Sequence, residues 1–329
     1  LTIAANGTLS APRGNLDLSA DLSVTGTFSH NNGKVRAMDT QTVQIQKDGN
    51  STPLTFYNLE ANTGWNSLRG VGGITVLNLL SATTRYNVIR PLDGNVSLTL
   101  GTDSDAGGLT GNAIQFTSNG TNYAEIKAAS SLKPWTAETA PDFDSGGSSS
   151  KVRIADCDMD PDITTGGGGV TITLTGDCEF DAVTVSSGDT LDLNGQRMEC
   201  SGLFRNQGTI DVDGGLVYAA DFNLDQAFTN ESGLNALVMT GTGDIDFGDS
   251  ELTSGTFMIN SSGTVTMEND HVVGNLLVGA GTLASSNTVN CTDLTIATGG
   301  TFNANDDIIT VAGDFTTSGG LIGKSALDM

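Results

Sequence analysis

A short segment recurs along the chain and constrains the fold more than any other feature. Residues 294–302 (Leu-Thr-Ile-Ala-Thr-Gly-Gly-Thr-Phe) repeat residues 1–9 (Leu-Thr-Ile-Ala-Ala-Asn-Gly-Thr-Leu) almost letter for letter, and weaker copies occupy 183–191 and 257–265. Each copy alternates apolar and polar residues, passes through a polar turn that holds glycine, and ends in threonine and an apolar residue. This pattern predicts a strand, a turn and a second strand.

The copies recur at a nearly constant step. Gly7 and Gly26 are separated by almost the same interval as Thr264 and Thr282, and as Thr282 and Thr301. A step of about 20 residues indicates a solenoid, in which each repeat buries its apolar face only by stacking on its neighbours. Leucine-rich repeats have a similar length, but their L-x-x-L-x-L framework is missing. We therefore predict an all-β chain built as a right-handed parallel β-helix, with the hand taken from the crossover rule.

Composition agrees with this prediction. The chain has 43 glycines among 329 residues, and no window of about a dozen residues keeps a helical apolar stripe free of glycine. Helix is therefore expected to be a minor component, while alternating segments such as 170–174 and 191–193 favour strands.

Three segments differ in composition. Residues 1–60 and 151–329 carry the repeat and are predicted to be a short β-solenoid segment and an acidic parallel β-helix. Residues 61–150 hold both tryptophans and end in a Gly/Ser linker, which favours an intervening β-rich module. The alternative is that irregular coils continue the solenoid through this stretch.

The charge is acidic and uneven. Residues 1–150 carry 9 Lys and Arg against 12 Asp and Glu, whereas residues 151–329 carry 5 against 26. Such a surface repels phosphate backbones, so no nucleic-acid partner is expected. No run of about 18 apolar residues occurs, so no membrane insertion is expected either.

One stretch has a more distinctive pattern. Residues 26–35 (Gly-Thr-Phe-Ser-His-Asn-Asn-Gly-Lys-Val) are followed at 55–59 by Thr-Phe-Tyr-Asn-Leu. This resembles the G-T-F-x-x-N-x-G-x-V … F-Y-N-L repeat of structural proteins of marine bacteriophages and of large secreted bacterial surface proteins. The resemblance covers residues 1–60 well and residues 180–320 loosely. It implies a location on a virion surface or at the cell surface, and it implies no particular chemistry.

Three cysteines fall about one coil apart. Cys157, Cys178 and Cys200 follow one another at nearly the step of the repeat, and an acidic residue precedes each. Neighbours in a strand point to opposite faces, so buried cysteines would place the acids outside. The stacked strands, ~4.8 Å apart, would allow a disulfide, but free cysteines that fill the core are favoured. Zinc is disfavoured, because Cys-x2-Cys spacing is absent and only two histidines could assist.

The outward acids form the candidate metal site. Carboxylates stacked on adjacent strands need either free solvation or a cation, and alternating aspartates resemble the start of calcium-binding loops. The match is incomplete, because Pro161 and Gly167 stand where an EF-hand has glycine and glutamate. A solvated acidic face is the alternative, and no cofactor is required. The candidate Ca²⁺ ligands are Asp156, Asp158, Asp160, Asp162, Asp177 and Glu179, with a weaker second group at Asp244, Asp246, Asp249 and Glu251.

Catalysis is not expected. The chain has no G-x-S-x-G elbow and no phosphate-binding loop, and its two histidines, His30 and His271, are expected to be structural or solvated. Polysaccharide lyases with this fold resemble one another in using a basic residue as proton abstractor, and residues 154–323 offer only Arg197 and Arg205. A glycan platform would draw on the aromatic residues of the middle segment, which are Trp65, Tyr86, Tyr123 and Trp135.

The sequence therefore favours a structural role. We expect a non-enzymatic component of a bacteriophage virion, such as a fibre, a spike or a capsid-decorating protein, that contacts other virion proteins. It should form a homo-oligomer, most simply a trimer, through an apolar strip along one face. The alternatives are a bacterial cell-surface adhesin, with a surface glycan as ligand, and third a polysaccharide depolymerase.

Overall fold

The computed structural model is all-β in the residues it describes. These residues contain no helix, and so none that could cross a membrane. Contacts between Cα atoms divide the chain into unit 1, Leu1–Glu179, and unit 2, Phe180–Met329. The structure describes residues 1–38, 43–47, 52–61, 66–70, 73–82, 87–89, 95–101, 108–111, 114–116, 121–128, 133–135, 150–159, 162–166, 168–226, 228–229, 236–247, 252–305, 307–323 and 327–328.

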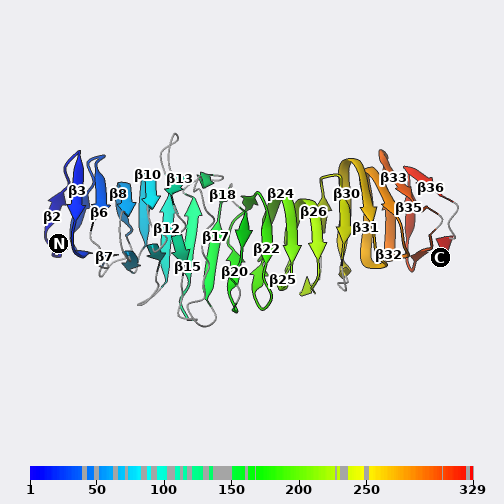
Figure 1. Ribbon diagram of the computed structural model, residues 1–329, viewed down its shortest axis with the longest axis horizontal. Coiled ribbons are helices and arrows are strands. Elements are labelled where there is room, and N and C mark those ends of the chain that lie inside the picture. Colours follow the sequence, from blue (N-terminus) through cyan, green and yellow to red (C-terminus); the bar gives the residue numbers. More distant parts are fainter. Residues whose placement is uncertain are drawn as a thin grey trace. The chain divides into compact units, whose positions relative to one another are not determined.

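Unit 1 is a stack of coils whose strands pair in parallel (Figure 1). One sheet runs through β1, β4, β7, β9, β11 and β14, and another through β3, β6, β8, β10, β12, β15, β17 and β20. The strands are β1 (Thr2–Ile3), β2 (Thr8–Ser10), β3 (Asn15–Leu18), β4 (Leu22–Val24), β5 (Thr27–Ser29), β6 (Lys34–Ala37), β7 (Val43–Lys47), β8 (Leu54–Ala61), β9 (Asn66–Gly70), β10 (Ile74–Ala82), β11 (Asn87–Ile89), β12 (Val96–Leu100), β13 (Gly108–Gly111), β14 (Ile114–Phe116), β15 (Ala124–Ala128), β16 (Lys133–Trp135), β17 (Lys151–Ala155), β18 (Cys157–Met159), β19 (Ile163–Thr164) and β20 (Thr171–Leu174), with β21 (Cys178–Phe180) at the division.

Unit 2 has the same construction. Its longest ladder joins β30 to β31 and β31 to β32, and every pairing between its strands is parallel in the described residues. The strands are β22 (Val183–Val185), β23 (Thr190–Asp192), β24 (Arg197–Asn206), β25 (Thr209–Asp211), β26 (Leu216–Leu224), β27 (Phe228–Thr229), β28 (Ala236–Met239), β29 (Asp244–Asp246), β30 (Leu252–Met267), β31 (His271–Ser285), β32 (Val289–Ile296), β33 (Gly300–Asn303), β34 (Ile309–Val311), β35 (Phe315–Thr317), β36 (Gly320–Ile322) and β37 (Leu327–Asp328).

Columns of apolar side chains form the core of unit 1. In one column the Cα partners on successive coils are Leu54, Ile74, Leu98, Ile126 and Ile154, each at most 2% exposed. Parallel strands pair at ~4.8 Å, so each side chain contacts the next along the column. The residues between them face outward, which is why the sequence alternates. The parallel β-solenoid expected from the repeat is confirmed.

The middle segment follows the same ladder with unequal coils. The interval between column partners is close to the regular step from Leu54 to Ile74, longer from Ile74 to Leu98, and longer again from Leu98 to Ile126. Strands β10, β12 and β15 are therefore paired as the continuing-solenoid alternative predicts. Whether residues 1–60, 61–150 and 151–329 fold as separate domains, with a linker at 145–150, stays a prediction. Ser150 is the one linker residue that the structure describes.

Aromatic rings fill the core of unit 2. Phe222 meets Phe204 edge-on at 5.9 Å between ring centroids and meets Phe257 at 6.1 Å, and Phe257 meets Phe247 at 5.2 Å. All four rings are at most 1% exposed. Such edge-to-face pairs stabilise a core beyond the area they bury.

Asparagine, aspartate and glycine form the corners. The carboxylate of Asp192 accepts a hydrogen bond from the backbone N–H of Asn194 at 2.9 Å, and Asn194 and Gly195 have φ of 48° and 73°. This turn, in which a side chain bonds the backbone two residues on, suits residues that tolerate a left-handed conformation. The same turn recurs at Asp211 to Asp213 and at Asn303 to Asn305.

Candidate functional site

The cysteines lie in the core, as expected. Cys157, Cys178, Cys200 and Cys291 are all buried and free, so the disulfide alternative is wrong and the core-filling interpretation is confirmed. Burial raises the pKa of the Cys178 and Cys200 thiols to about 12. A buried thiol that stays protonated is a poor nucleophile.

The neighbouring acids do not form one continuous outward column. Asp158 and Glu179 are half-buried, whereas Asp162 and Asp177 are exposed. Asp156 occupies a corner with φ of 54°, and an added Cβ at Gly176 would lie 2.7 Å from its carboxylate. The expectation that Asp156 continues a strand is therefore wrong, because the chain turns there.

Calcium binding is not tested by this arrangement. Asp160 lies outside the described residues, and within the described ones no three His, Cys, Asp or Glu side chains are grouped to hold a metal ion. In the second candidate group, Asp246 accepts a hydrogen bond from Asn269 at 2.9 Å, Asp244 is exposed, and Asp249 and Glu251 lie outside the described residues. Ligation by the predicted set, Asp156, Asp158, Asp160, Asp162, Asp177 and Glu179, stays a prediction.

The distinctive motif of residues 26–35 and 55–59 joins neighbouring coils from inside. Phe28 of β5 contacts Phe56 of β8 at 5.4 Å between ring centroids. Phe56 is fully buried, and Val35 and Leu59, which pair between β6 and β8, are each 2% exposed. Three apolar residues of the motif, Val35, Phe56 and Leu59, are thus core positions, and Phe28 is half-buried.

The polar residues of the motif form hydrogen bonds between neighbouring coils at the corner. Asn31, with φ of 48°, donates hydrogen bonds from Nδ2 to Ser10 Oγ at 2.6 Å and to the carbonyl of Ala11 at 2.8 Å, both on the preceding coil. A Cβ at Gly33 would lie 2.1 Å from the carbonyl oxygen of Pro12, so only glycine fits. Both residues therefore hold one coil on the next.

An open depression of about 690 Å³ lies at this corner and is lined by Arg13, Ser29, His30, Asn31 and Asn32. The His30 ring stacks on Tyr57 at 5.9 Å between centroids, with 18° between the planes. Its Nδ1 accepts a hydrogen bond from the backbone N–H of Asn32 at 3.0 Å. His30 is thus held as part of the turn, as predicted.

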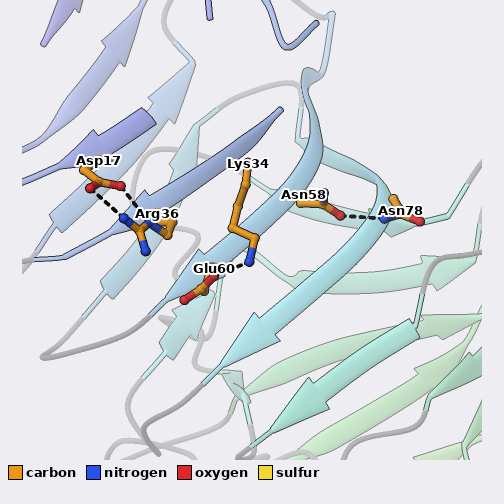
Figure 2. A network of polar contacts seen from close by, with 6 residues as sticks. All are labelled: Asp17, Lys34, Arg36, Asn58, Glu60 and Asn78. Atoms are coloured by element: carbon orange, nitrogen blue, oxygen red, sulfur yellow. Dashed lines mark hydrogen bonds and ion pairs between the residues drawn. The ribbon is translucent and has the colours of Figure 1, made fainter. Parts of the chain in front are cut away.

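Charged residues form a ladder on the outer face of β3, β6 and β8. Figure 2 shows Arg36 forked onto Asp17, with two hydrogen bonds of 2.7 Å, and Lys34 bonded to Glu60 at 2.7 Å. The hydrogen bonds to Arg36 lower the pKa of the Asp17 carboxyl. Exposed pairs of this kind contribute little energy each, but opposite charges on adjacent coils fix their register.

Amides extend this ladder. Asn78 of β10 donates to the side-chain oxygen of Asn58 of β8 at 2.6 Å (Figure 2). The ladder was not predicted from the sequence, although Asp17 and Arg36 are separated by the same interval as Gly7 and Gly26. Scanning for opposite charges at the coil step would have found it.

The basic residues considered for a lyase reaction have acidic neighbours. Arg197 pairs with Glu199 and lies over the Tyr218 ring at 4.6 Å. Arg205 lies 3.8 Å from the carboxylate of Asp225. In this arrangement each guanidinium faces a carboxylate of its own unit.

Two carboxylates in unit 2 lie on paired strands. Asp221 of β26 and Asp244 of β29 each directly precede the paired residues Phe222 and Ile245. Burial, and then the charge of Asp244, raise the pKa of Asp221. Glycoside hydrolysis uses a pair of carboxyl groups. These are the residues on which the depolymerase alternative can be tested.

The aromatic residues considered for glycan binding are only partly described. The guanidinium of Arg153 lies over the Tyr123 ring at 3.8 Å, which makes Tyr123 part of a cation–π pair. Trp65 and Tyr86, together with the side chains of Trp135 and His271, lie outside the described part of the chain.

An outward apolar strip crosses unit 2. Tyr218, Val238, Met258 and Leu277 are successive Cα partners on β26, β28, β30 and β31, between columns that face the core. Val238 is buried, and Tyr218, Met258 and Leu277 are half-buried. Association through an apolar strip stays a prediction.

Comparisons with known proteins add no assignment: no family model matches the sequence, and neither curated proteins nor solved structures give a match.

Proposed function

We propose that this protein is a non-enzymatic structural component of a bacteriophage virion, such as a fibre, a spike or a capsid-decorating protein, that acts as a rigid surface scaffold. One observation carries the proposal: the most distinctive motif of the chain is used to join coils. Phe28 and Phe56 pack together, Asn31 bonds the preceding coil, and Gly33 allows two backbones to approach. The resemblance of this motif to phage structural repeats supplies the virion setting.

The chemistry of the outer surface supports a mechanical role. Catalytic motifs keep reactive side chains directed toward a substrate. Here the cysteines are buried as neutral thiols, and Arg36 and Lys34 are bonded to carboxylates of adjacent coils. These interactions stiffen the stack.

The apolar strip supports lateral association into a homo-oligomer, most simply a trimer. In that assembly Tyr218, Met258 and Leu277 would be covered by the neighbouring subunit. The part of these three side chains that stays accessible is the apolar surface that the contact would bury.

Immunoelectron microscopy tests the proposal. Antibodies raised against the purified chain should label phage particles from the source culture and leave the host envelope unlabelled. Labelling of uninfected cells instead would replace the virion proposal with the cell-surface adhesin, whose glycan could occupy the depression at Arg13 and His30.

A second assay separates the scaffold from the depolymerase. The purified chain should release no reducing ends from acidic polysaccharides with or without Ca²⁺. Sugar release that is lost in Asp221→Asn and Asp244→Asn variants with unchanged circular dichroism would overturn the structural proposal.

A further inference from the structure

The open depression in unit 1 lies at the corner of the second coil, which is the coil of β4, β5 and β6. Four of its five lining residues come from the end of β5 and the turn before β6, and the fifth, Arg13, reaches it from the first coil. The second coil is paired on both sides, because β6 pairs with β3 of the first coil and with β8 of the third. The depression therefore belongs to the stack of coils itself.

The turn that lines the depression is held by both neighbouring coils. Asn31 donates a hydrogen bond to Ser10 Oγ on the first coil at 2.6 Å, and the His30 ring stacks on Tyr57 of the third coil. Asn31 and Asn32 have φ of 48° and 58°, a left-handed conformation that asparagine tolerates. These contacts fix the lining before a ligand arrives, which reduces the entropic cost of binding.

One of these contacts determines which nitrogen of His30 carries the proton. Nδ1 accepts a hydrogen bond from the backbone N–H of Asn32 at 3.0 Å, so the neutral imidazole carries its proton on Nε2. Within the residues that the structure describes, no group accepts a hydrogen bond from this Nε2–H. It is left as a donor at the depression.

Arg13 is the charged residue of the lining, which contains no carboxylate. The cations of the neighbouring strand β6 are both paired, Lys34 with Glu60 and Arg36 with Asp17. Among the described residues Arg13 forms no such pair, and its side chain is exposed. A planar guanidinium binds a carboxylate through two parallel hydrogen bonds, so Arg13 is available to a carboxylate from outside the chain.

The other lining groups suit hydroxyls. The side-chain amide of Asn32 is exposed and offers both donors and an acceptor. The Ser29 hydroxyl donates to Asn31 Oδ1 at 3.2 Å and can still accept a hydrogen bond. The volume of about 690 Å³ is within the range of small-molecule sites, about 300–1,000 Å³. The depression thus combines one carboxylate-binding group with several groups that bind hydroxyls.

We propose that this depression binds a carboxylated sugar, such as a uronate residue of an acidic polysaccharide. The carboxylate pairs with the Arg13 guanidinium, and the sugar hydroxyls bind the Nε2–H of His30 and the amide of Asn32. Because the lining contains no pair of carboxyl groups, the bound sugar is held and not hydrolysed. This binding site goes beyond the scaffold role, since it gives the rigid stack a ligand.

Two variants remove the proposed contacts and leave the joints between coils in place. Arg13→Ala removes the guanidinium, and Asn32→Gly removes the amide while keeping a residue suited to positive φ. The matched control for Arg13→Ala is Arg153→Ala, which removes the same charge elsewhere in unit 1, where the guanidinium lies over the Tyr123 ring. A difference between the two alanine variants therefore reports the position of the charge.

Calorimetric titration of the whole chain with a galacturonate trimer measures the binding, and a neutral galactose trimer is the matched ligand. The wild type and Arg153→Ala should bind the galacturonate trimer with equal affinity, and Arg13→Ala should bind it at least about tenfold more weakly. Asn32→Gly should bind it about three- to tenfold more weakly. The wild type should bind the neutral trimer at least about tenfold more weakly than the charged one.

Four results would overturn the proposal: no binding of the galacturonate trimer at millimolar concentration, equal binding of the neutral trimer, equal affinity of Arg13→Ala and Arg153→Ala, or binding of acetate as tight as that of the trimer. The last result would mean that the depression recognises charge alone. Circular dichroism checks that each variant is folded. None of these results affects the labelling of virions, so failure of the sugar site and failure of the scaffold function are distinguishable.

Discussion

Gly26 is a residue at which a single added methyl group should damage the stack, because two carbonyl oxygens surround it. In Gly26→Ala the added Cβ would lie 2.2 Å from the carbonyl oxygen of Ala4 and 2.3 Å from that of Gly7. Both carbonyls are in use, because Ala4 O accepts from the N–H of Gly7 at 2.7 Å and Gly7 O accepts from Thr27 at 2.9 Å. Relief of the clash requires both oxygens to move by about 1 Å, which breaks or stretches both bonds.

The cost follows from these contacts. Two weakened backbone hydrogen bonds cost about 0.5–1.5 kcal/mol each, and the overpacked corner costs about 1–3 kcal/mol more. We expect a loss of about 3 kcal/mol, which for a unit of this size lowers the melting temperature by about 6–12 °C. Gly14→Ala is the matched control, because an added Cβ there has nothing within 4 Å, and it should stay within about 0.5 kcal/mol of the wild type.

Thermal unfolding followed by far-UV circular dichroism, with urea unfolding as a second measure, tests the reasoning. Gly319→Ala should reproduce the loss in unit 2, since its Cβ would meet the equivalent carbonyls of Ala297 and Gly300. If Gly26→Ala and Gly14→Ala unfold within about 0.5 kcal/mol of each other, the corner is not as tightly packed as described and the argument fails.

Three further predictions concern the core and the acids. Phe257→Ala should cost about 3–5 kcal/mol in urea unfolding, and combining it with Phe247→Ala should cost less than the sum by about 0.5–1.5 kcal/mol; strict additivity would contradict the ring contact. Burial raises the pKa of the Cys178 thiol from 9.0 to about 12, so its contribution to the free energy of unfolding is present below pH 9 and is lost as pH rises toward 12. In Cys178→Ala the urea midpoint should therefore fall less steeply between pH 9 and pH 12. An unchanged profile would count against burial of the thiol. If the predicted acids bind Ca²⁺, the cation should raise the melting temperature of the wild type. The double variant Asp158→Asn with Asp177→Asn should abolish this rise, and the control Asp192→Asn with Asp211→Asn should keep it. If Ca²⁺ does not raise the melting temperature of the wild type, the predicted acids form a solvated face instead.

The length of the repeat could be predicted from the sequence because it is set by the pairing of strands on successive coils. The threonines that mark the copies, Thr264, Thr282 and Thr301, are Cα partners on successive coils. Each coil must return the same side chain to the same column, so equal spacing in sequence becomes register in space. The inward cysteines followed from the same alternation.

The sequence of the middle segment shows no fixed repeat spacing, and the reason is physical. Corners tolerate insertions because their residues do not enter the core, and the interval from Leu98 to Ile126 is longer than the interval from Leu54 to Ile74. A search for a fixed spacing therefore loses the ladder there, although the apolar columns persist.

The candidate site was less predictable than the fold. Alternation does not reveal where a chain turns, so Asp156 was expected in a strand and lies at a corner with positive φ. The pairing of Asp17 with Arg36 depends on which coils are adjacent. Such features require the three-dimensional arrangement.

The pairing of each coil with its sequence neighbours has a mechanical consequence. Coils within a unit contact chiefly the coil before and the coil after, so a stretching force should detach one coil at a time. Each detached coil would lengthen the chain by about 70 Å, at ~3.3–3.6 Å per extended residue. Under tension the protein should therefore yield in steps of one coil each, and the steps should be longer where the coils of the middle segment are longer.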